Sequence, residues 1–271
     1  MQGSENSGVK VERRGRVIEI TIDRPKVNAI NHAASKAMGD AIRQLHEDPE
    51  LLVGIITGAG DRVFSAGWDL KAVNSGEQQL DNWWETEKDL FGGFAGVGEN
   101  WVLNKPVIAA LNGITIGGGF EIAMACDLVI AAEHVEFSLP EMPLGIVPDA
   151  GALQRLPHRL PYNIAVELLL LGRRMSAKEA AGYGFVNAVV PKDQVMPKAR
   201  EWADKLAGCA PLAVQTIKEV LRAIQADSIE GSYRRMRTEH LPTYRAMLKS
   251  EDAKEGVRAF VEKRAPVFKG R

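Results

Sequence analysis

Residues 108–127 read IAALNGITIGGGFEIAMACD, in which a buried-strand pattern runs through three consecutive glycines into the start of an apolar helix. Glycine lets a ligand approach the backbone closely and permits unusual dihedral angles. A helix start presents unpaired N–H groups and the positive end of the helix dipole. Together these features are typical of a site for a developing negative oxygen. Glu121 falls in the first helical turn, although a triple glycine alone favours a tight turn with Glu121 on the surface.

Two other segments could complete such a site. FSAGWDLK at residues 64–71 follows an expected strand and could supply another backbone N–H, or it could be a plain loop with Trp68 in the core. FSLPEMPLGIVPDAG at residues 137–151 carries Glu141 in an apolar, proline-rich stretch. Burial there would raise the pKa of the Glu141 carboxyl group and suit it to proton transfer. Glu141 and Asp149 could equally be solvated loop carboxylates.

Strand and helix patterns alternate in the first part of the chain. Strands are expected at residues 17–23, 51–57, 107–111 and 128–132, and a helix at residues 34–45. This alternation, with continuous apolar runs of strand length, predicts an α/β core with a buried parallel sheet.

The last part of the chain has a mostly helical pattern. Helices are expected at residues 195–206, 213–224, 233–248 and 255–261. Ser176 and Ser250 are expected to cap the helices that follow them. The chain is therefore divided into a flexible tail (1–10), a core that would hold the active site (11–192) and a helical region (193–271).

The composition excludes several functional classes. The 271 residues are 45% apolar and 25% charged, which rules out a disordered or fibrous chain. Lysine plus arginine (34) balances aspartate plus glutamate (35), so nucleic-acid binding has no electrostatic driving force. Cys126 and Cys209 lie far apart and form no CxxC motif, which disfavours a disulfide framework and indicates a reducing, cytoplasmic compartment. No apolar run approaches the ~18 residues of a membrane helix.

The motifs of several other enzyme classes do not occur. Without a GxSxG element, Ser65 and Ser138 are poor candidates for a nucleophile. Neither GxGxxG nor GxxxxGK[ST] is present, which argues against dinucleotide and P-loop sites. The histidines show no metal-ligand spacing, so no metal site is expected.

Six stretches, taken in order, resemble the crotonase (enoyl-CoA hydratase/isomerase) superfamily over nearly the whole chain. They are RPKVNAIN (24–31), FSAGWDLK (64–71), KPVIAALNG (105–113), GGGFE (117–121), LPEMPLGIVPDAG (139–151) and FVEKRAPVFKGR (260–271). Within the superfamily, SAGWDLK, LGIVPDAG and the SEDAKEG…EKRAPVFKGR ending look most like the carnitinyl-CoA dehydratases, or crotonobetainyl-CoA hydratases.

The resemblance implies a crotonase-like spiral of ββα units whose C-terminal helices, here 193–271, build homotrimers that often stack into hexamers. It places the backbone N–H groups of Trp68 and Gly118 in an oxyanion hole, and the two catalytic glutamates at Glu121 and Glu141. It also implies contacts with coenzyme A from residues on both halves of the chain. These are Lys26, Val27, Ala66, Lys71 and, reaching a neighbouring subunit's ligand, Phe260 and Lys263.

The implied reaction is reversible syn addition of water to a 2-enoyl-CoA through an enolate. Glu141 would exchange the proton at Cα and Glu121 would accept a proton from water, although two such acids titrate as a pair. Coenzyme A is part of the substrate, and no permanently bound cofactor, nucleic acid or membrane is expected.

Two residues depart from the simple hydratases of the superfamily. Trp68 replaces a small residue, and Asp149 replaces a glycine beside the catalytic water. Both departures agree with the dehydratase-like sequences, whose trimethylammonium substrate would benefit from aromatic faces. The pocket candidates, besides Trp68 and Asp149, are Trp83, Trp84, Phe91 and Phe94, although residues 83–94 could be an ordinary amphipathic helix.

Other functions on the same fold stay open. A short-chain enoyl-CoA hydratase or an enoyl-CoA isomerase is the alternative enzyme, and many isomerases need only the glutamate at position 141. A non-catalytic acyl-CoA-binding protein would have lost Glu121 or Glu141, and neither is lost. An RNA-binding homologue would need a basic stripe, which the near-zero net charge does not support.

Overall fold

A computed structural model describes residues 7–77, 79 and 81–271. The strands are β1 (Val9–Arg14), β2 (Val17–Ile22), β3 (Val53–Gly58), β4 (Val63–Ser65), β5 (Val107–Leu111), β6 (Ile114–Ile116), β7 (Leu128–Ala132), β8 (Glu136–Ser138), β9 (Met175–Ser176) and β10 (Ala188–Val190). The α-helices are α1 (His32–Glu47), α2 (Leu70–Asn74), α3 (Trp83–Glu87), α4 (Gly118–Ala125), α5 (Ala152–Arg159), α6 (Tyr162–Leu171), α7 (Ala177–Gly182), α8 (Val195–Ala207), α9 (Pro211–Ile224), α10 (Ile229–Thr238), α11 (Pro242–Lys249) and α12 (Glu251–Glu262). The 3-10 helices are η1 (Phe94–Gly96), η2 (Met142–Leu144) and η3 (Lys192–Gln194).

The strands form two sheets, and a repeated unit supplies the pairs β3-β4, β5-β6 and β7-β8. The larger sheet has the order β1-β2-β3-β5-β7-β10, and the smaller sheet has the order β4-β6-β8-β9. Each unit adds a long strand to the larger sheet, then a short strand to the smaller sheet, then a helix, as in β5-β6-α4. Because β3, β5 and β7 pair in parallel, as do β4, β6 and β8, the predicted spiral of ββα units is confirmed.

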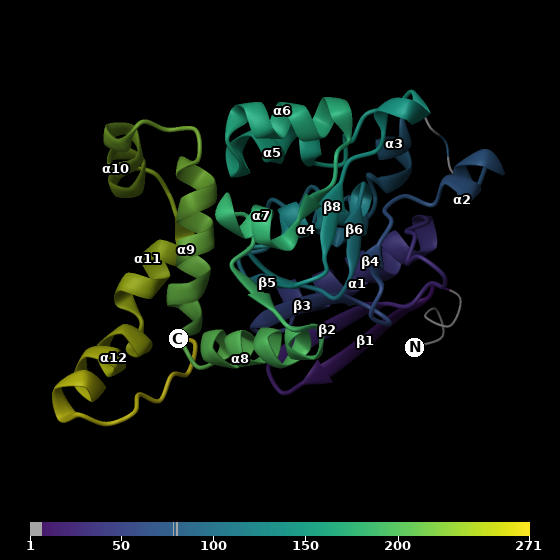
Figure 1. The fold of residues 1–271 in the computed structure, drawn as a ribbon. Helices are drawn as coiled ribbons and strands as arrows, with labels where there is room; N and C mark the ends of the chain where they lie inside the picture. The colour runs from purple at the N-terminus through teal and green to yellow at the C-terminus, as the bar shows by residue number, and fades with distance from the viewer. Residues whose placement is uncertain (1–6, 78, 80) are drawn as a thin grey trace.

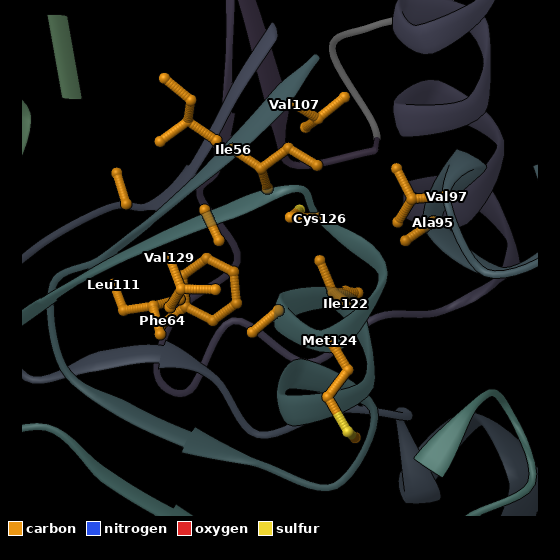
Figure 2. Packing of buried hydrophobic residues seen from close by; sticks show 14 of the residues in the cluster. Ile56, Phe64, Ala95, Val97, Val107, Leu111, Ile122, Met124, Cys126 and Val129 are labelled. Carbon is orange, nitrogen blue, oxygen red and sulfur yellow. The ribbon is translucent and has the colours of Figure 1, made fainter. Parts of the chain in front are cut away.

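The hydrophobic core lies where α4 contacts both sheets. Ile56 of β3 and Val129 of β7 belong to the same buried cluster as Ile122 of α4 (Figure 2). The rings of Phe120 and Phe137 pack 4.9 Å apart between their centroids. This packing holds the first turn of α4 against the sheets, and therefore fixes where the triple glycine lies.

The strand predictions agree closely with the structure, and one helix prediction is wrong. β5 and β7 have the predicted bounds, and the predicted parallel pairing of β3 is confirmed. The single helix expected at 233–248 is two helices, α10 and α11, separated before Pro242. Proline cannot continue a helix, because it has no N–H and its ring clashes with the preceding turn. The Glu219 carboxylate accepts hydrogen bonds from the N–H groups of Thr243 and Tyr244, so α11 starts anew.

Both predicted serine caps are confirmed, and the tail prediction is too long. Ser176 Oγ accepts a hydrogen bond from the Glu179 N–H (3.1 Å), and Ser250 Oγ accepts one from Ala253 (3.0 Å). The expected flexible tail at 1–10 overlaps β1, which begins at the buried Val9 and pairs with β2. Residues 1–6 of that tail lie outside the described residues.

The C-terminal helices differ in how they pack. α8, although it falls in the helical region expected at 193–271, packs across β2, β3, β5 and β7 of the larger sheet. α9 runs along the side of the core, and α10, α11 and α12 extend away from it (Figure 1). None of the helices in the described ranges is long and apolar enough to cross a membrane.

A buried lysine ties the end of α1 to the start of β5. The Lys105 ammonium donates hydrogen bonds to the carbonyl oxygens of Leu45 and Asp48, both at 2.7 Å. We predict that Lys105→Met lowers the free energy of unfolding by about 1.5–3 kcal/mol, because charged hydrogen bonds of this kind are lost. Lys36→Met is the control, since Lys36 is exposed and should change stability by less than about 0.5 kcal/mol. Equal urea midpoints for the two variants would contradict this role.

Candidate active site

Two backbone segments meet at the start of α4. Gly67 has a φ of +81°, and a Cβ atom on it would lie 2.3 Å from the Gly118 nitrogen, so only glycine allows this approach. Ser65 fixes the loop, because its Oγ accepts a hydrogen bond from the Gly67 N–H (3.0 Å) and donates one to the Asn28 carbonyl (2.7 Å). The next residue, Trp68, therefore lies beside the first turn of α4, whose N–H groups have no acceptor within the helix.

Gly117 makes room for a carboxylate. Its φ of +53° and ψ of −126° are unfavourable for other residues, and a Cβ atom there would lie 2.8 Å from Oε1 of Glu141. The Gly117 N–H donates to the Ser138 carbonyl (3.0 Å), which joins the α4 start to the segment that carries Glu141. The triple glycine thus serves two contacts: one with the Gly67 loop and one with Glu141.

These segments enclose a cavity of about 270 Å³. Backbone of Gly117 and Gly118, the carboxylates of Glu121 and Glu141, and the apolar segment 144–148 line it. Trp68 contributes to the same lining. The cavity therefore brings together the two amide positions and the two glutamates that the sequence analysis singled out.

Glu121 lies almost fully buried in the first turn of α4, with 4% of its surface exposed. Its Oε1 accepts a hydrogen bond from the Ala152 N–H at the start of α5 (3.0 Å). Burial raises the pKa of Glu121 to about 8, and the nearby negative charges of Glu141 and Asp149 add to this rise. The alternative of Glu121 as a surface residue is therefore wrong.

Glu141 is also buried, with 9% of its surface exposed. Burial raises the pKa of Glu141 to about 7, as its apolar sequence context predicted. Within the described part of the chain, its buried Oε2 has no hydrogen-bond partner. A buried carboxylate oxygen without a partner is costly, so this atom is suited to hydrogen bonding with a bound water or substrate.

The arrangement is suited to acid–base chemistry at neutral pH. Two carboxyl groups with pKa values near 7 and 8 can each give or take a proton there. Amide N–H groups at a helix start favour a negative oxygen. In the described residues, no group of three or more His, Cys, Asp or Glu side chains could hold a metal ion.

Aromatic residues and Asp149 form another wall of the cavity. Trp68, Trp83, Phe94 and Asp149 all line it. The Trp83 Nε1–H donates a hydrogen bond to Oδ2 of Asp149 (3.0 Å). The Trp83 ring meets Trp68 edge-on at 5.8 Å and Phe94 at 6.5 Å between ring centroids. Three of the expected pocket residues, Trp83, Phe94 and Asp149, thus line the same cavity as the two glutamates.

Two of the expected pocket residues lie elsewhere. Trp84 is 47% exposed, and its ring packs against the ring of Trp83. Successive residues of a helix face different sides, so Trp84 does not share the direction of Trp83. Phe91 packs against the His46 ring, 5.5 Å away, and lies under the Arg43 guanidinium. Neither side chain lines the cavity described above, so this part of the expectation is corrected.

The residues expected to bind coenzyme A fall into two groups. Ala66 lines the cavity, and its N–H donates to the Val27 carbonyl (3.0 Å), which places Lys26 and Val27 beside it. Lys71 lies in the first turn of α2, where it is exposed. Phe260 and Lys263 lie at the end of α12, which Figure 1 shows on the side of the molecule away from α2 and α3. They do not line this chain's own cavity.

Sequence reasoning missed several residues that shape the site. Ala152, whose N–H donates to Glu121, directly follows the motif at residues 139–151, and the apolar segment 144–148 lies within it. Their position in or next to this motif could have indicated that they contribute to the site. Arg155 lies in none of the quoted motifs, so the sequence did not indicate a role for it. Its buried guanidinium donates to the Gly98 carbonyl (2.5 Å), and its positive charge partly offsets the raised pKa of Glu121.

Comparison with known proteins agrees with this geometry. The family model described as "Enoyl-CoA hydratase/isomerase" matches residues 12–271. The chain belongs to the enoyl-CoA hydratase/isomerase family. It is 50% identical to a protein named carnitinyl-CoA dehydratase from Salmonella typhi over 98% of this chain and 100% of that protein.

Solved structures of the enoyl-CoA hydratase/isomerase family have the same fold. An enoyl-CoA hydratase from Mycobacterium tuberculosis superposes with a TM-score of 0.87 at 37% identity, covering 98% of this chain and 100% of that one. A carnitinyl-CoA hydratase from Mycobacterium avium gives a TM-score of 0.74 at 43% identity, with the same coverage. The crotonase resemblance and the predicted fold class are therefore confirmed.

The raised pKa values make stability depend on pH. Above the ordinary glutamate pKa of 4.5 the unfolded chain releases a proton that folded Glu121 keeps until pH about 8. We therefore predict that the wild-type free energy of unfolding falls from pH 5 to pH 8. Between pH 5 and pH 8, the free energy of unfolding of Glu121→Gln should rise relative to that of the wild type by on the order of 2–4 kcal/mol.

The measurement is urea unfolding at several pH values and one fixed chain concentration. Glu133→Gln is the matched control, because Glu133 is exposed and its removal should leave the wild-type slope intact. A pH slope in Glu121→Gln equal to that of the wild type would contradict burial of a protonated Glu121.

Proposed function

We propose that this protein catalyses the reversible hydration and dehydration of a 2-enoyl-CoA thioester. The observation that carries the proposal is the pair of buried carboxyl groups, Glu121 and Glu141, in one cavity with the Gly118 and Trp68 positions. Carnitinyl-CoA dehydratases and enoyl-CoA hydratases among the similar proteins support it. The protein is accordingly a hydro-lyase of the enoyl-CoA hydratase/isomerase family.

In this proposal the backbone amides of Trp68 and Gly118 bind the thioester oxygen. Addition of water at Cβ places negative charge on that oxygen, and two N–H donors stabilise it as an enolate. Removal of one such donor typically costs about 2.7–4 kcal/mol of barrier. The close contact between the Gly67 loop and α4 supports this assignment, because it keeps the two amide positions adjacent without a side chain between them.

The two glutamates divide the proton transfers. We assign to Glu121 the proton from the water that attacks Cβ, and to Glu141 the proton that is exchanged at Cα. The Ala152 hydrogen bond engages Oε1 of Glu121, and Oε2 of Glu141 is buried without a partner in the described part of the chain, which supports a bound water or substrate as its partner. Because neighbouring acids titrate as a pair, kinetic pKa values will belong to the pair.

The acyl group that we propose is carnitinyl or crotonobetainyl. Similar proteins named carnitinyl-CoA dehydratase and carnitinyl-CoA hydratase support this choice, as do Trp68 and Asp149 in the cavity lining. A short-chain enoyl-CoA hydratase is the alternative. An isomerase that uses Glu141 alone is less favoured, because Glu121 is also buried in the cavity with a raised pKa.

Replacing either glutamate tests the chemistry. We predict that Glu121→Gln and Glu141→Gln each lower kcat by about 10²–10⁴-fold, because general acid–base catalysis is lost while the side-chain volume is kept. Affinity for the CoA ester, measured by calorimetry, should change little. Glu133→Gln, with an exposed carboxylate, should keep wild-type turnover of enoyl-CoA followed by thioester-enone absorbance. Near-normal turnover in both active-site variants would refute the assignment.

We also propose that the chain forms homotrimers or hexamers through its C-terminal helices. Exposed apolar side chains lie on α9, which runs along the side of the core, and on α10 and α12, which extend away from it (Figure 1). They include Ile217, Leu221, Ile229, Val257, Phe260 and Val261. Exposed apolar surface of this kind is typical of protein interfaces. A second copy would also explain how Phe260 and Lys263, remote from this chain's cavity, reach coenzyme A.

Light scattering coupled to gel filtration tests this assembly. We expect a mass three or six times that of the 29.6 kDa chain. A single-chain mass at micromolar concentration would contradict both the assembly and the proposed contacts of Phe260 and Lys263 with coenzyme A.

The proposal has consequences for cofactors and location. Coenzyme A enters as part of the substrate, and Glu121, Glu141 and the backbone amides supply the proton transfers and charge stabilisation that hydration needs.

We propose a cytoplasmic location with Cys126 and Cys209 as free thiols, as they are in the structure. Cell fractionation tests the location, and recovery of the protein outside the cytoplasm would overturn it.

A further inference from the structure

Arg155, which lies one turn into α5, connects two parts of the cavity wall. Its Nη2 donates a hydrogen bond to the carbonyl oxygen of the buried Gly98 (2.5 Å). The Gly98 N–H in turn donates to the Phe94 carbonyl (3.0 Å), and Phe94 lines the cavity. The Phe94 ring lies so close to Gly118 that a Cβ atom there would be 2.9 Å from it. Arg155 therefore joins α5 to the segment that packs against the start of α4.

The Arg155 guanidinium folds back over the first residues of its own helix. A Cβ atom on Gly151 would lie 2.2 Å from Nη1 of Arg155, so the guanidinium lies directly against this glycine. The next residue, Ala152, donates its N–H to Oε1 of Glu121 (3.0 Å). The positive charge of Arg155 and the buried carboxyl group of Glu121 therefore lie at the same helix start.

A positive charge at this place is unfavourable unless it serves an anion. The start of a helix is the positive end of its dipole. Burial lowers the pKa of Arg155, and the like charge of Arg159 lowers it further, whereas Glu121, Cys126 and Glu99 raise it. Burial raises the pKa of the Cys126 thiol to about 12, so this group is neutral at pH 7. Because Glu99 is exposed and water weakens its field, Glu121 is the buried anion that favours the charge.

The other charges that act on Glu121 oppose its ionisation. Glu141 and Asp149 both raise the pKa of Glu121, and Arg155 lowers it. The cavity lining contains no lysine, arginine or histidine among the described residues, so this positive charge acts from behind the wall. A carboxyl group can accept a proton only in its ionised form. With the pKa of Glu121 at about 8, the loss of Arg155 would leave an even smaller ionised fraction at neutral pH.

We propose that Arg155 is a positioning residue for Glu121, which holds the start of α5 against the Gly98 segment and directs a positive charge at the buried carboxylate. It keeps the Ala152 N–H in place and favours the form of Glu121 that takes the proton from water. Arg155 acts through Glu121 and Ala152, since it does not line the cavity. The role of that proton rests on the proposed function, whereas the effect of the charge on Glu121 does not.

Three variants separate the charge from the structural contact. Arg155→Met removes the charge and the hydrogen bond but keeps a long side chain. Arg155→Lys keeps a positive charge and an N–H donor. Arg159→Met is the matched control, because Arg159 is exposed, lies on the same helix and donates to the Cys126 carbonyl (3.3 Å). If Arg155→Met does not fold, Arg155→Gln replaces it with the same expected result, because glutamine is neutral and keeps an N–H donor.

The first measurement needs no turnover. Infrared difference titration follows the carboxylic acid C=O stretch, and the band that is missing in Glu121→Gln belongs to Glu121. We expect the midpoint of this band to rise by about 0.5–1 pH unit in Arg155→Met, because a nearby positive charge is lost. Arg155→Lys and Arg159→Met should stay within about 0.3 pH units of the wild type. An unchanged midpoint in folded Arg155→Met would show a merely structural role and overturn the proposal.

The second measurement is the pH profile of kcat/KM for hydration of crotonyl-CoA and crotonobetainyl-CoA. In Arg155→Met the acid limb should move to higher pH by the same amount, so kcat/KM falls about 3–10-fold at pH 6 and less than about twofold at pH 9. Arg155→Lys should restore the wild-type profile. An equal fall at every pH would overturn the proposal and leave the hydratase intact. If the wild type hydrates neither substrate, the proposed function is refuted, and the infrared titration alone decides whether Arg155 acts on Glu121.

Discussion

The site depends on one close backbone contact, between the Gly67 loop and the first turn of α4. No side chain fits between them, since a Cβ atom on Gly67 would lie 2.3 Å from the Gly118 nitrogen. This contact keeps the Trp68 and Gly118 positions adjacent in one cavity wall. Glu121 follows in the first turn of α4 and lines the same cavity. The parallel sheets and the core around α4 hold the two segments at this distance.

The second constraint is electrostatic. Glu121 and Glu141 are buried in a cavity whose described lining has no basic side chain, so each ionised carboxylate is costly. Because burial disfavours the ionised form, both carboxyl groups have pKa values near neutrality. Such values suit groups that must both give and take a proton. Stability is therefore lowered at the place where the proposed chemistry needs acid and base together.

Local patterns predicted the parts of the fold and site that short segments determine. The bounds of β5 and β7, the serine caps and the raised pKa of Glu141 follow from apolar runs, capping residues and sequence context. The break before Pro242 was missed although proline itself indicated it. Trp84 and Phe91 were misplaced because spacing does not tell which face of a short helix meets a cavity. The Trp83–Asp149 hydrogen bond joins distant segments, so only the fold reveals it.

The central claim is that a thioester oxygen binds between the Trp68 and Gly118 amides, with both glutamates beside the reacting carbons. A crystal structure with acetoacetyl-CoA, which resists hydration, tests it most directly. The account predicts that the thioester oxygen lies about 2.7–3.1 Å from both amide nitrogens, as in an oxyanion hole. It also predicts that Glu121 and Glu141 flank Cα and Cβ of the acyl group. A thioester oxygen bound away from these amides, or an acyl group outside the cavity, would contradict the account.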